Sequence, residues 1–415
     1  MKKLRNDFQE NAYHTILDNG LNVYIIEKKG FKKSVAAYGT RFGAVNLLQT
    51  LNGELVTHKQ GLAHFLEHKL FEDEAGDILS QFTDMGASAN AFTSYDQTVY
   101  YFSTNHELEG PLKLLIKLIN RIYVNHDSIE KEKGIIVEEL KMYEHNPNMN
   151  LLMKTYENVY HQFPMKYDIG GTADSVNNTT LEDVLLAYNM NYQPSQMALV
   201  VVSGESKSTI LDIIKKCPMR NIEGSWDVKD VFEAEPLDVV KKDDSYQFPI
   251  QTPKASLSFK FKYDGDNHLY DEFLMRSLLN LNFSQLSDDF QSWLDQDIIN
   301  SYFSFDVDLR DGFGVVYFFN EGENNHLFKE IIGDRMNQLT IDENTFNQIT
   351  KRYFGESILS LSQYDRYAIN VMRAHFRNTN YYDYLKSIKE VSLNDIERVM
   401  AYLKDFSVSF LEMRP

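Results

Sequence analysis

The pattern of hydrophobic and polar positions along the chain predicts a mixture of strands and helices. Alternating runs near the start, TILDNGLNVYII and SVAAYGTRFG, predict strands, with a type I′ turn at Asn19 and Gly20. Helical spacing predicts helices over 61–71 and 76–85 and in the long run from LEGPLKLL to ENVYHQF. Strands are expected in ASANAFTS and QTVYYFSTN. Because strands and helices are grouped rather than strictly alternating, the pattern favours an α+β fold over a doubly wound sheet.

A capped helix followed by a strand occurs in the middle of the chain and again at its end. Thr180 and Asp183 are expected to form a capping box in TTLEDVLLAYNMNYQPSQMALVVVS, and Ser392 and Asp395 occupy the same positions in VSLNDIERVMAYLKDFSVSFLEMRP. The two segments lie about half a chain length apart, which suggests a duplicated α+β unit. We therefore predict an N-terminal domain over 1–218, a charged linker region over 219–250 and a related C-terminal domain over 251–415.

The charge balance and the cysteine content exclude several classes of protein. The formal net charge is -18, whereas a nucleic-acid-binding protein needs clustered Lys and Arg. Cys217 is the single cysteine, so neither an intrachain disulfide nor a cysteine-based zinc site is possible, and a reducing compartment is expected. The basic start lacks a following apolar run, and MALVVV is too short to span a bilayer. These features predict a cytoplasmic protein that binds neither nucleic acid nor membrane.

The stretch GLAHFLEHKLF contains His64, Glu67 and His68 within five positions. Residues four apart lie on one face of a helix, so both imidazoles can reach one ion, and imidazole suits Zn²⁺. Glu67, at the edge of that face, could take the proton of a metal-activated water. A chance match to His-x-x-acid-His in a chain of this composition is expected on the order of 0.04 times. The alternative, a pair of ordinary surface or core histidines, is therefore the weaker interpretation.

A third ligand is expected from the helix in EKEKGIIVEELKMYEH. Glu139 shares a face with Glu132, Ile136 and Leu140, whereas Glu138 falls on a polar face. A carboxylate on an apolar face is costly unless it is paired or bound to metal, so Glu139 is the candidate ligand. Glu132 lies two turns earlier on the same face and is a candidate to hydrogen-bond a ligand histidine and orient it. The alternative is an ordinary amphipathic helix with a charged flank.

With these residues in place, the chain resembles the insulinase/pitrilysin (inverzincin) family of zinc metallopeptidases. The resemblance rests on His64-Phe-Leu-Glu67-His68, on Glu132-Lys-Gly-Ile-Ile-Val-Glu-Glu139 and on GASANAFTSYDQTVYYFS, and it covers nearly the whole chain. The chain is most similar to the short-chain branch, which includes the mitochondrial processing peptidases and bacterial relatives. The implied fold has two homologous halves, each a largely antiparallel sheet with helices packed on it, that together form half of a clamshell.

The resemblance also implies an activity, a zinc-dependent endopeptidase acting on peptides or unfolded segments. Zn²⁺ would be held by His64, His68 and Glu139, and Glu67 would be the general base toward the bound water. Asn90 and Ala91 would lie in an edge strand with which an extended substrate pairs.

The second half of the chain departs from the family pattern. Active members carry an Arg and a Tyr seven residues apart, and here Tyr302 fits while Asp295 stands where the Arg would be. Arg310 is nearby but is not expected to substitute. Short-chain members pair into dimers, so we expect a dimer, with a related chain supplying the Arg-Tyr pair or with a second copy and a weakened site. The alternative function is a non-catalytic structural or assembly subunit, and the intact zinc motif argues against it.

Overall fold

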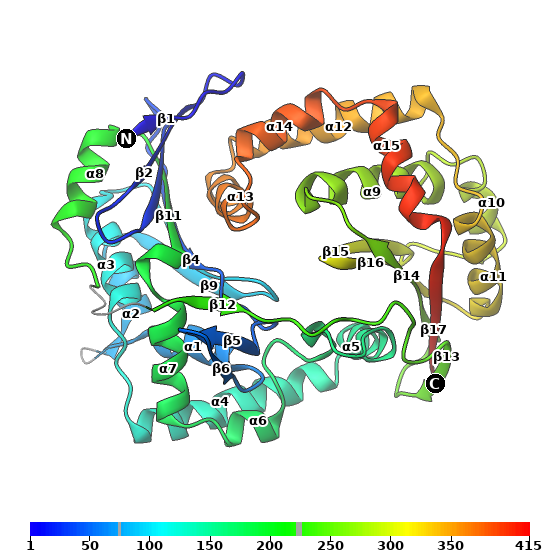
Figure 1. Cartoon of the computed structure of the whole chain (residues 1–415), viewed down its shortest axis with the longest axis horizontal. Coiled ribbons are helices and arrows are strands. Elements are labelled where there is room, and N and C mark those ends of the chain that lie inside the picture. Colours follow the sequence, from blue (N-terminus) through cyan, green and yellow to red (C-terminus); the bar gives the residue numbers. More distant parts are fainter. Residues whose placement is uncertain (74–75, 221–225) are drawn as a thin grey trace. The chain divides into compact units, whose positions relative to one another are not determined.

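The computed structural model describes residues 1–73, 76–220 and 226–415 (Figure 1). The chain divides into two compact units, each drawn from separate parts of the sequence. The first unit comprises Met1–Lys141, Tyr167–Phe232 and Ile358–Asp383, and the second comprises Met142–Lys166, Glu233–Ser357 and Tyr384–Pro415.

The main sheet of the first unit has seven strands. In spatial order they are β1 (Lys2–Lys3), β2 (Asn11–Ile16), β3 (Asn22–Glu27), β11 (Met197–Ser203), β4 (Ser34–Thr40), β10 (Thr98–Thr104) and β9 (Ala87–Thr93). All neighbours are antiparallel except β3 and β11. Every residue of β4 and β11 is buried, which indicates that both faces of the sheet are covered at its centre.

Smaller strands and the helices complete the first unit. A three-stranded sheet has the order β12 (Val228–Asp230), β5 (Leu48–Leu51) and β6 (Glu54–Thr57), and β7 (Glu72–Asp73) pairs with β8 (Gly76–Asp77). The helices are α1 (Leu62–Leu70), α2 (Ile78–Asp84), α3 (Glu109–Asn120), most of α4 (His126–Glu144), α6 (Ala173–Asn177), α7 (Leu181–Asn191), α8 (Lys207–Lys216) and α13 (Tyr364–Phe376), with a 3₁₀ turn at Pro194–Gln196.

The second unit is built on a five-stranded sheet. Its spatial order is β13 (Asp243–Gln247), β17 (Phe406–Arg414), β14 (Lys254–Tyr263), β16 (Gly312–Glu321) and β15 (Ser304–Arg310), and only β13 and β17 are parallel. The helices are α5 (Pro147–Val159), α9 (His268–Phe283), α10 (Phe290–Asp295), α11 (Asn325–Met336), most of α12 (Glu343–Ser360) and of α14 (Tyr381–Lys389), and α15 (Leu393–Met400), with 3₁₀ turns at Pro164–Lys166 and Ala401–Lys404.

The two sheets share one topology. Numbered in chain order, the strands β3, β4, β9, β10 and β11 run 1-5-2-4-3 across the first sheet, and β13 to β17 run 1-5-2-4-3 across the second. The predicted capping boxes are both present, at Thr180 with Asp183 and at Ser392 with Asp395, and each capped helix leads into the last strand of its sheet. This repetition confirms the predicted α+β class with two homologous halves.

Each compact unit nevertheless contains a helix from the other half of the sequence. Helix α5 packs on β14 and β17, and α13 packs on β4 and β11, as Figure 1 shows for α13 in orange. The packing of α13 is close, because a Cβ added to Gly39 would lie 2.4 Å from the sulfur of Met372. The compact units therefore exchange helices between the two halves, and the ranges 1–218 and 251–415 stay predictions for the extents of the homologous domains.

Two local features also differ from the sequence-based expectations. Gly20 has a φ of 89° but Asn19 does not have a positive φ, so the first hairpin is not a type I′ turn. Instead Leu17 N–H donates to Leu21 O and closes a longer loop. The region 219–250 contains β12 and β13, although 221–225 lies outside the described residues.

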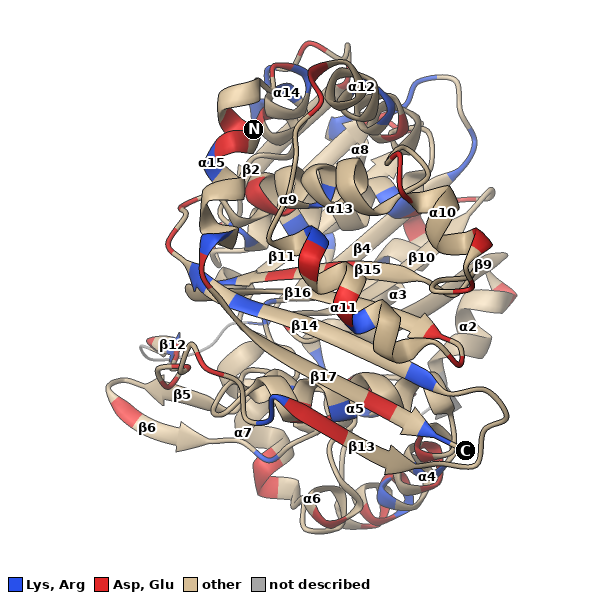
Figure 2. Ribbon diagram, turned by 90° about the vertical axis from the view of Figure 1, so that its right-hand side faces the viewer, with Lys and Arg blue, Asp and Glu red and all other residues tan. Residues whose placement is uncertain are grey.

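Acidic and basic side chains are interspersed on the second sheet. Figure 2 shows acidic positions on the edge strand β13, and basic positions on its neighbour β17 and on the next strand, β14. Among the described helices, none combines the length and the apolar composition needed to cross a bilayer.

Candidate metal centre

At the start of helix α1, the backbone at Gly61 packs directly against the backbone at Gly170. Gly61 has a φ of 80°, and a Cβ there would lie 2.1 Å from the carbonyl oxygen of Gly170. A side chain is therefore excluded on both conformational and steric grounds. Leu62, Phe65 and Leu66 are buried in the core, so the opposite face of α1 presents His64, Glu67 and His68, each partly buried.

Helix α4 places its carboxylates as the spacing predicts. Glu132 is buried with Ile136 and Leu140 on the inward face. The side chain of Glu139 is 26% exposed, whereas that of Glu138 is 74% exposed and pairs with Lys141.

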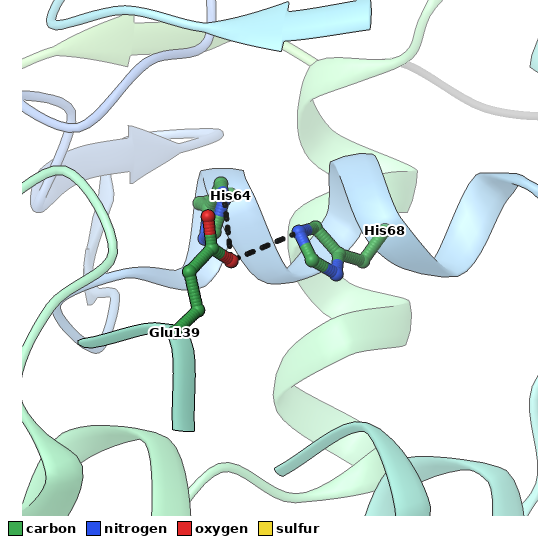
Figure 3. A group of neighbouring side chains, drawn as sticks. All are labelled: His64, His68 and Glu139. Atoms are coloured by element: carbon green, nitrogen blue, oxygen red, sulfur yellow. Dashed lines mark ion pairs between the residues drawn. The ribbon is translucent and has the colours of Figure 1, made fainter. Parts of the chain in front are cut away.

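His64, His68 and Glu139 come together between α1 and α4 (Figure 3). Oε2 of Glu139 lies 3.8 Å from Nε2 of His64 and 3.6 Å from Nε2 of His68. Two ligand atoms bound to one zinc ion at a tetrahedral angle lie about 3.4 Å apart, so the spacing of these donors suits Zn²⁺. The donor set of two imidazoles and one carboxylate also matches that of catalytic zinc sites, in which a fourth position stays open. The residues present therefore fit a zinc ion.

The ionisation of the two histidines differs because their surroundings differ. Burial, with the nearby ring of His68, lowers the pKa of His64 to about 4, so this ring is neutral and able to bind metal at physiological pH. Burial also acts to lower the pKa of His68, but the hydrogen bond that its Nδ1–H donates to Glu132, and the charges of Glu132, Glu67 and Glu139, outweigh it and raise the pKa overall. Nδ1 of His68 lies 2.9 Å from Oε1 of Glu132, which leaves Nε2 facing Glu139.

Glu67 lies beside the three donors and has the properties of a general base. Burial raises the pKa of its carboxyl group, partly offset by a hydrogen bond from Thr93. A carboxylate with a raised pKa accepts protons more readily near neutral pH. Thr93 Oγ1 donates to Oε2 of Glu67 at 2.8 Å, so the end of β9 fixes this side chain. Sequence reasoning missed Thr93, although the strand ASANAFT ends at this residue.

Strand β9 forms one edge of the seven-stranded sheet. The N–H of Ser94 donates to the carbonyl of Gln97, and the alternation of the antiparallel ladder then leaves the backbone groups of Ala89 and Ala91 on the free side. The N–H of Ala91 donates to Oδ1 of Asn90 at 2.8 Å. Asn90 and Ala91 thus lie on an edge strand that also carries the hydrogen-bond partner of Glu67.

The residues considered in the second half belong to the other compact unit, whereas the side chains above all lie in the first. Tyr302 is 59% exposed, with the ammonium of Lys254 5.1 Å from its ring centroid. Asp295 accepts a hydrogen bond from Gln291. Nε of Arg310 lies 2.9 Å from Asp308, so this guanidinium already has a carboxylate partner.

Comparison with known proteins identifies relatives over the whole chain. Residues 56–173 match the family described as Insulinase (Peptidase family M16), and residues 178–353 match the Peptidase M16 inactive domain. The chain is 31% identical to the uncharacterized zinc protease YmfH of Bacillus subtilis over 94% of both chains. It is 27% identical to the human mitochondrial-processing peptidase subunit beta over 37% of this chain and 33% of that protein.

The fold agrees with these sequence relationships. The crystal structure of a putative M16-like peptidase from Alicyclobacillus acidocaldarius superposes with a TM-score of 0.91 at 27% identity, covering 98% of this chain and 99% of that one. A protease of Helicobacter pylori shares the fold, with a TM-score of 0.83 at 20% identity over 98% of this chain and 100% of that one. These matches confirm the resemblance inferred from the zinc motif, and the chain belongs to the insulinase family of peptidases, M16.

Proposed function

We propose that the protein is a zinc-dependent endopeptidase that cleaves peptides or unfolded segments. The observation that carries the proposal is the cluster of His64, His68 and Glu139, with Glu67 beside it. Its donor spacing suits Zn²⁺, and Glu67 combines a raised pKa with a fixed orientation. Relatives that bear the name zinc protease support the same activity.

Each residue has a defined task in this proposal. His64, His68 and Glu139 would hold the zinc, which supplies an activated water and a Lewis acid when bound. Glu67 accepts the proton from the attacking water and delivers it to the departing amine, while Thr93 keeps one carboxylate oxygen in place. The free side of β9 at Ala89 and Ala91 pairs with the backbone of an extended peptide. Because this pairing uses backbone groups, it selects unfolded segments more than particular side chains.

Replacing the proposed base tests the proposal. We expect wild-type protein purified without chelators to contain about one zinc per chain and to cleave an unfolded protein such as casein, slowly as the isolated chain and faster with a related partner chain. Glu67→Gln should retain the zinc and lose roughly 10²- to 10⁴-fold in kcat, since a positioned general base contributes on that scale. Metal analysis and fluorogenic peptide assays provide the two measurements.

The control is Glu138→Gln, which changes an exposed glutamate on the same helix as Glu139. It should leave both zinc content and cleavage unchanged. Absence of zinc in the wild-type protein, or full activity of Glu67→Gln, would refute the proposal.

A non-catalytic structural subunit is the second candidate function. Asp295 in place of the expected Arg favours it, as does the match of the second half to an inactive domain. The presence of His64, Glu67, His68 and Glu139 together favours the peptidase. Zinc binding without cleavage under any pairing would favour the structural role.

We further propose that the protein works as a dimer in the cytoplasm. The related human protein is named as one subunit of a processing peptidase, which supports pairing with a related chain. A single cysteine fits a reducing compartment. The dimer hypothesis is tested by the activity of the isolated chain, considered below.

A further inference from the structure

Lys69, the residue after His68, is completely buried. Its side chain has 0% exposure, and an ammonium group is rarely buried unless partners compensate for its lost hydration. Its Nζ lies 2.5 Å from Oε2 of Glu72 and donates to the carbonyl oxygen of Ser128 at 3.1 Å. Ser128 lies in the first turn of α4, so Lys69 connects α1, which carries two of the proposed ligands, to the helix that carries the third.

A further contact of Lys69 involves the carboxylate that orients His68. Nζ lies 3.6 Å from Oε2 of Glu132, while Oε1 of the same carboxylate lies 2.9 Å from Nδ1 of His68. The two oxygens of Glu132 are thus divided between two consecutive residues of α1. This division restricts rotation of the carboxylate, because turning it toward one partner moves it away from the other.

We propose that Lys69 is a positioning residue for the zinc centre, a role that rests on the proposed function. Lys69 holds Glu132 so that Oε1 faces Nδ1 of His68, and Nε2 of His68 is thereby directed toward the metal. An apolar side chain would fill the same volume without burying a charge. The contacts that Lys69 makes to Glu132, Glu72 and Ser128 are consistent with a fixed anchor for this carboxylate.

Lys69→Met tests the proposal, because the methionine side chain is unbranched, only one heavy atom shorter than that of lysine, and suits a buried position. We expect zinc affinity, measured by competition with a chromophoric chelator, to fall about tenfold, the lower end of the range for groups that orient a ligand. Removing a positive charge on its own would strengthen the binding of Zn²⁺. A loss of affinity therefore reports lost orientation rather than altered charge.

A double-mutant cycle identifies the route of the effect. If Lys69 acts through Glu132, Lys69→Met should not weaken zinc binding further in a Glu132→Gln background. Lys133→Met is the matched control, since Lys133 is a largely buried lysine of α4 paired with Glu130. It should retain wild-type affinity.

Glu72→Gln covers the case in which Lys69→Met fails to fold. It loosens the anchor of Lys69 without changing buried volume and should weaken zinc binding by a smaller factor. Suppose that the wild type binds zinc and that Glu132→Gln weakens this binding. If Lys69→Met, or Glu72→Gln in its place, then binds zinc at least as tightly as the wild type, the inference about Lys69 is wrong and the peptidase proposal stands. If the wild type binds no zinc, the peptidase proposal itself fails.

Discussion

At the scale of single residues, the proposed centre depends on which atom each side chain presents. Nδ1 of His68 is hydrogen-bonded to Glu132 and its Nε2 faces Glu139, while one carboxylate oxygen of Glu67 accepts a hydrogen bond from Thr93. Each of these contacts leaves one atom free for chemistry and fixes the other. The same logic explains why groups that never touch a substrate can influence the reaction.

A buried histidine away from the proposed zinc centre should make stability sensitive to acid. Nε2 of His58 lies 2.8 Å from Oε1 of Gln49, and burial lowers the pKa of His58 from 6.5 to about 4. The unfolded chain therefore binds more protons between these values, so the free energy of unfolding falls as pH decreases from 6.5 toward 4.

Replacing His58 should reduce this acid sensitivity. The loss of unfolding free energy between about pH 6.5 and pH 4.5 should be smaller by roughly 2 kcal/mol in His58→Gln than in the wild type. Urea unfolding at a series of pH values, in the presence of chelator, measures this free energy of unfolding. His145→Gln, at an exposed position, should behave as the wild type, and equal slopes for all three proteins would contradict the prediction.

The sequence was sufficient to predict the cluster of candidate ligands and the contact of Glu132 with one of the histidines, but not the contacts made by Thr93 and Lys69. His64, His68, Glu132 and Glu139 could be selected because helical periodicity assigns each residue to a face. Thr93 acts through contact with a residue on another element, and the same holds for Lys69. Such contacts have no periodic signature along the chain and appear only once the fold is known.

At the scale of elements, strand β9 connects the proposed substrate-binding edge to the proposed base. Its free side presents backbone groups at Ala89 and Ala91, and its last residue holds Glu67. A peptide that pairs with this strand would lie next to the donor cluster. Edge strands usually need protection from such pairing, and here the exposed edge serves as the proposed binding site.

Removing one edge-facing N–H tests this arrangement. Ala91→Pro should raise KM for a peptide substrate by roughly fivefold, the effect of one hydrogen bond of about 1 kcal/mol, while zinc content stays unchanged. The N–H of Ala91 lies outside the β9–β10 ladder, so the sheet should tolerate proline there. Steady-state kinetics provides KM.

The control, Lys3→Pro, introduces proline in β1 at the opposite edge of the same sheet. It should leave KM unchanged. An unaltered KM in Ala91→Pro would show that peptides do not pair with this part of β9.

Elements with strong local signals were predictable, and the two capping boxes are examples. The turn at Asn19 and Gly20 was not, because the hydrogen bond from Leu17 N–H to Leu21 O favours a longer loop than the dipeptide alone indicates. The pairing of α5 and α13 with particular sheets was also inaccessible. An amphipathic helix specifies that it needs an apolar partner but not which sheet provides it.

At the scale of the whole molecule, two sheets of one topology have diverged in chemistry. The first unit carries the complete zinc motif, whereas the second has Asp295 where an arginine is expected. Without a donor for the developing oxyanion, catalysis is weakened by about 10²- to 10³-fold per lost donor.

The isolated chain should therefore bind zinc but cleave peptides slowly. Adding a related chain that has the Arg-Tyr pair and lacks the zinc motif should raise the rate by about 10²-fold or more. Light scattering of the mixture reports complex formation, and peptide assays report the rate. Robust cleavage by the isolated chain would contradict the heterodimer hypothesis.

The packing of α13 on β4 and β11 has a consequence for biosynthesis. The first sheet is complete once β11 has left the ribosome, but the helix that covers part of its centre is encoded far downstream. Until α13 has been synthesised, apolar surface on that sheet remains open to water and to other nascent chains. A messenger truncated before residue 364 would yield a product that retains every residue of the zinc motif and lacks the helix that packs on β4 and β11.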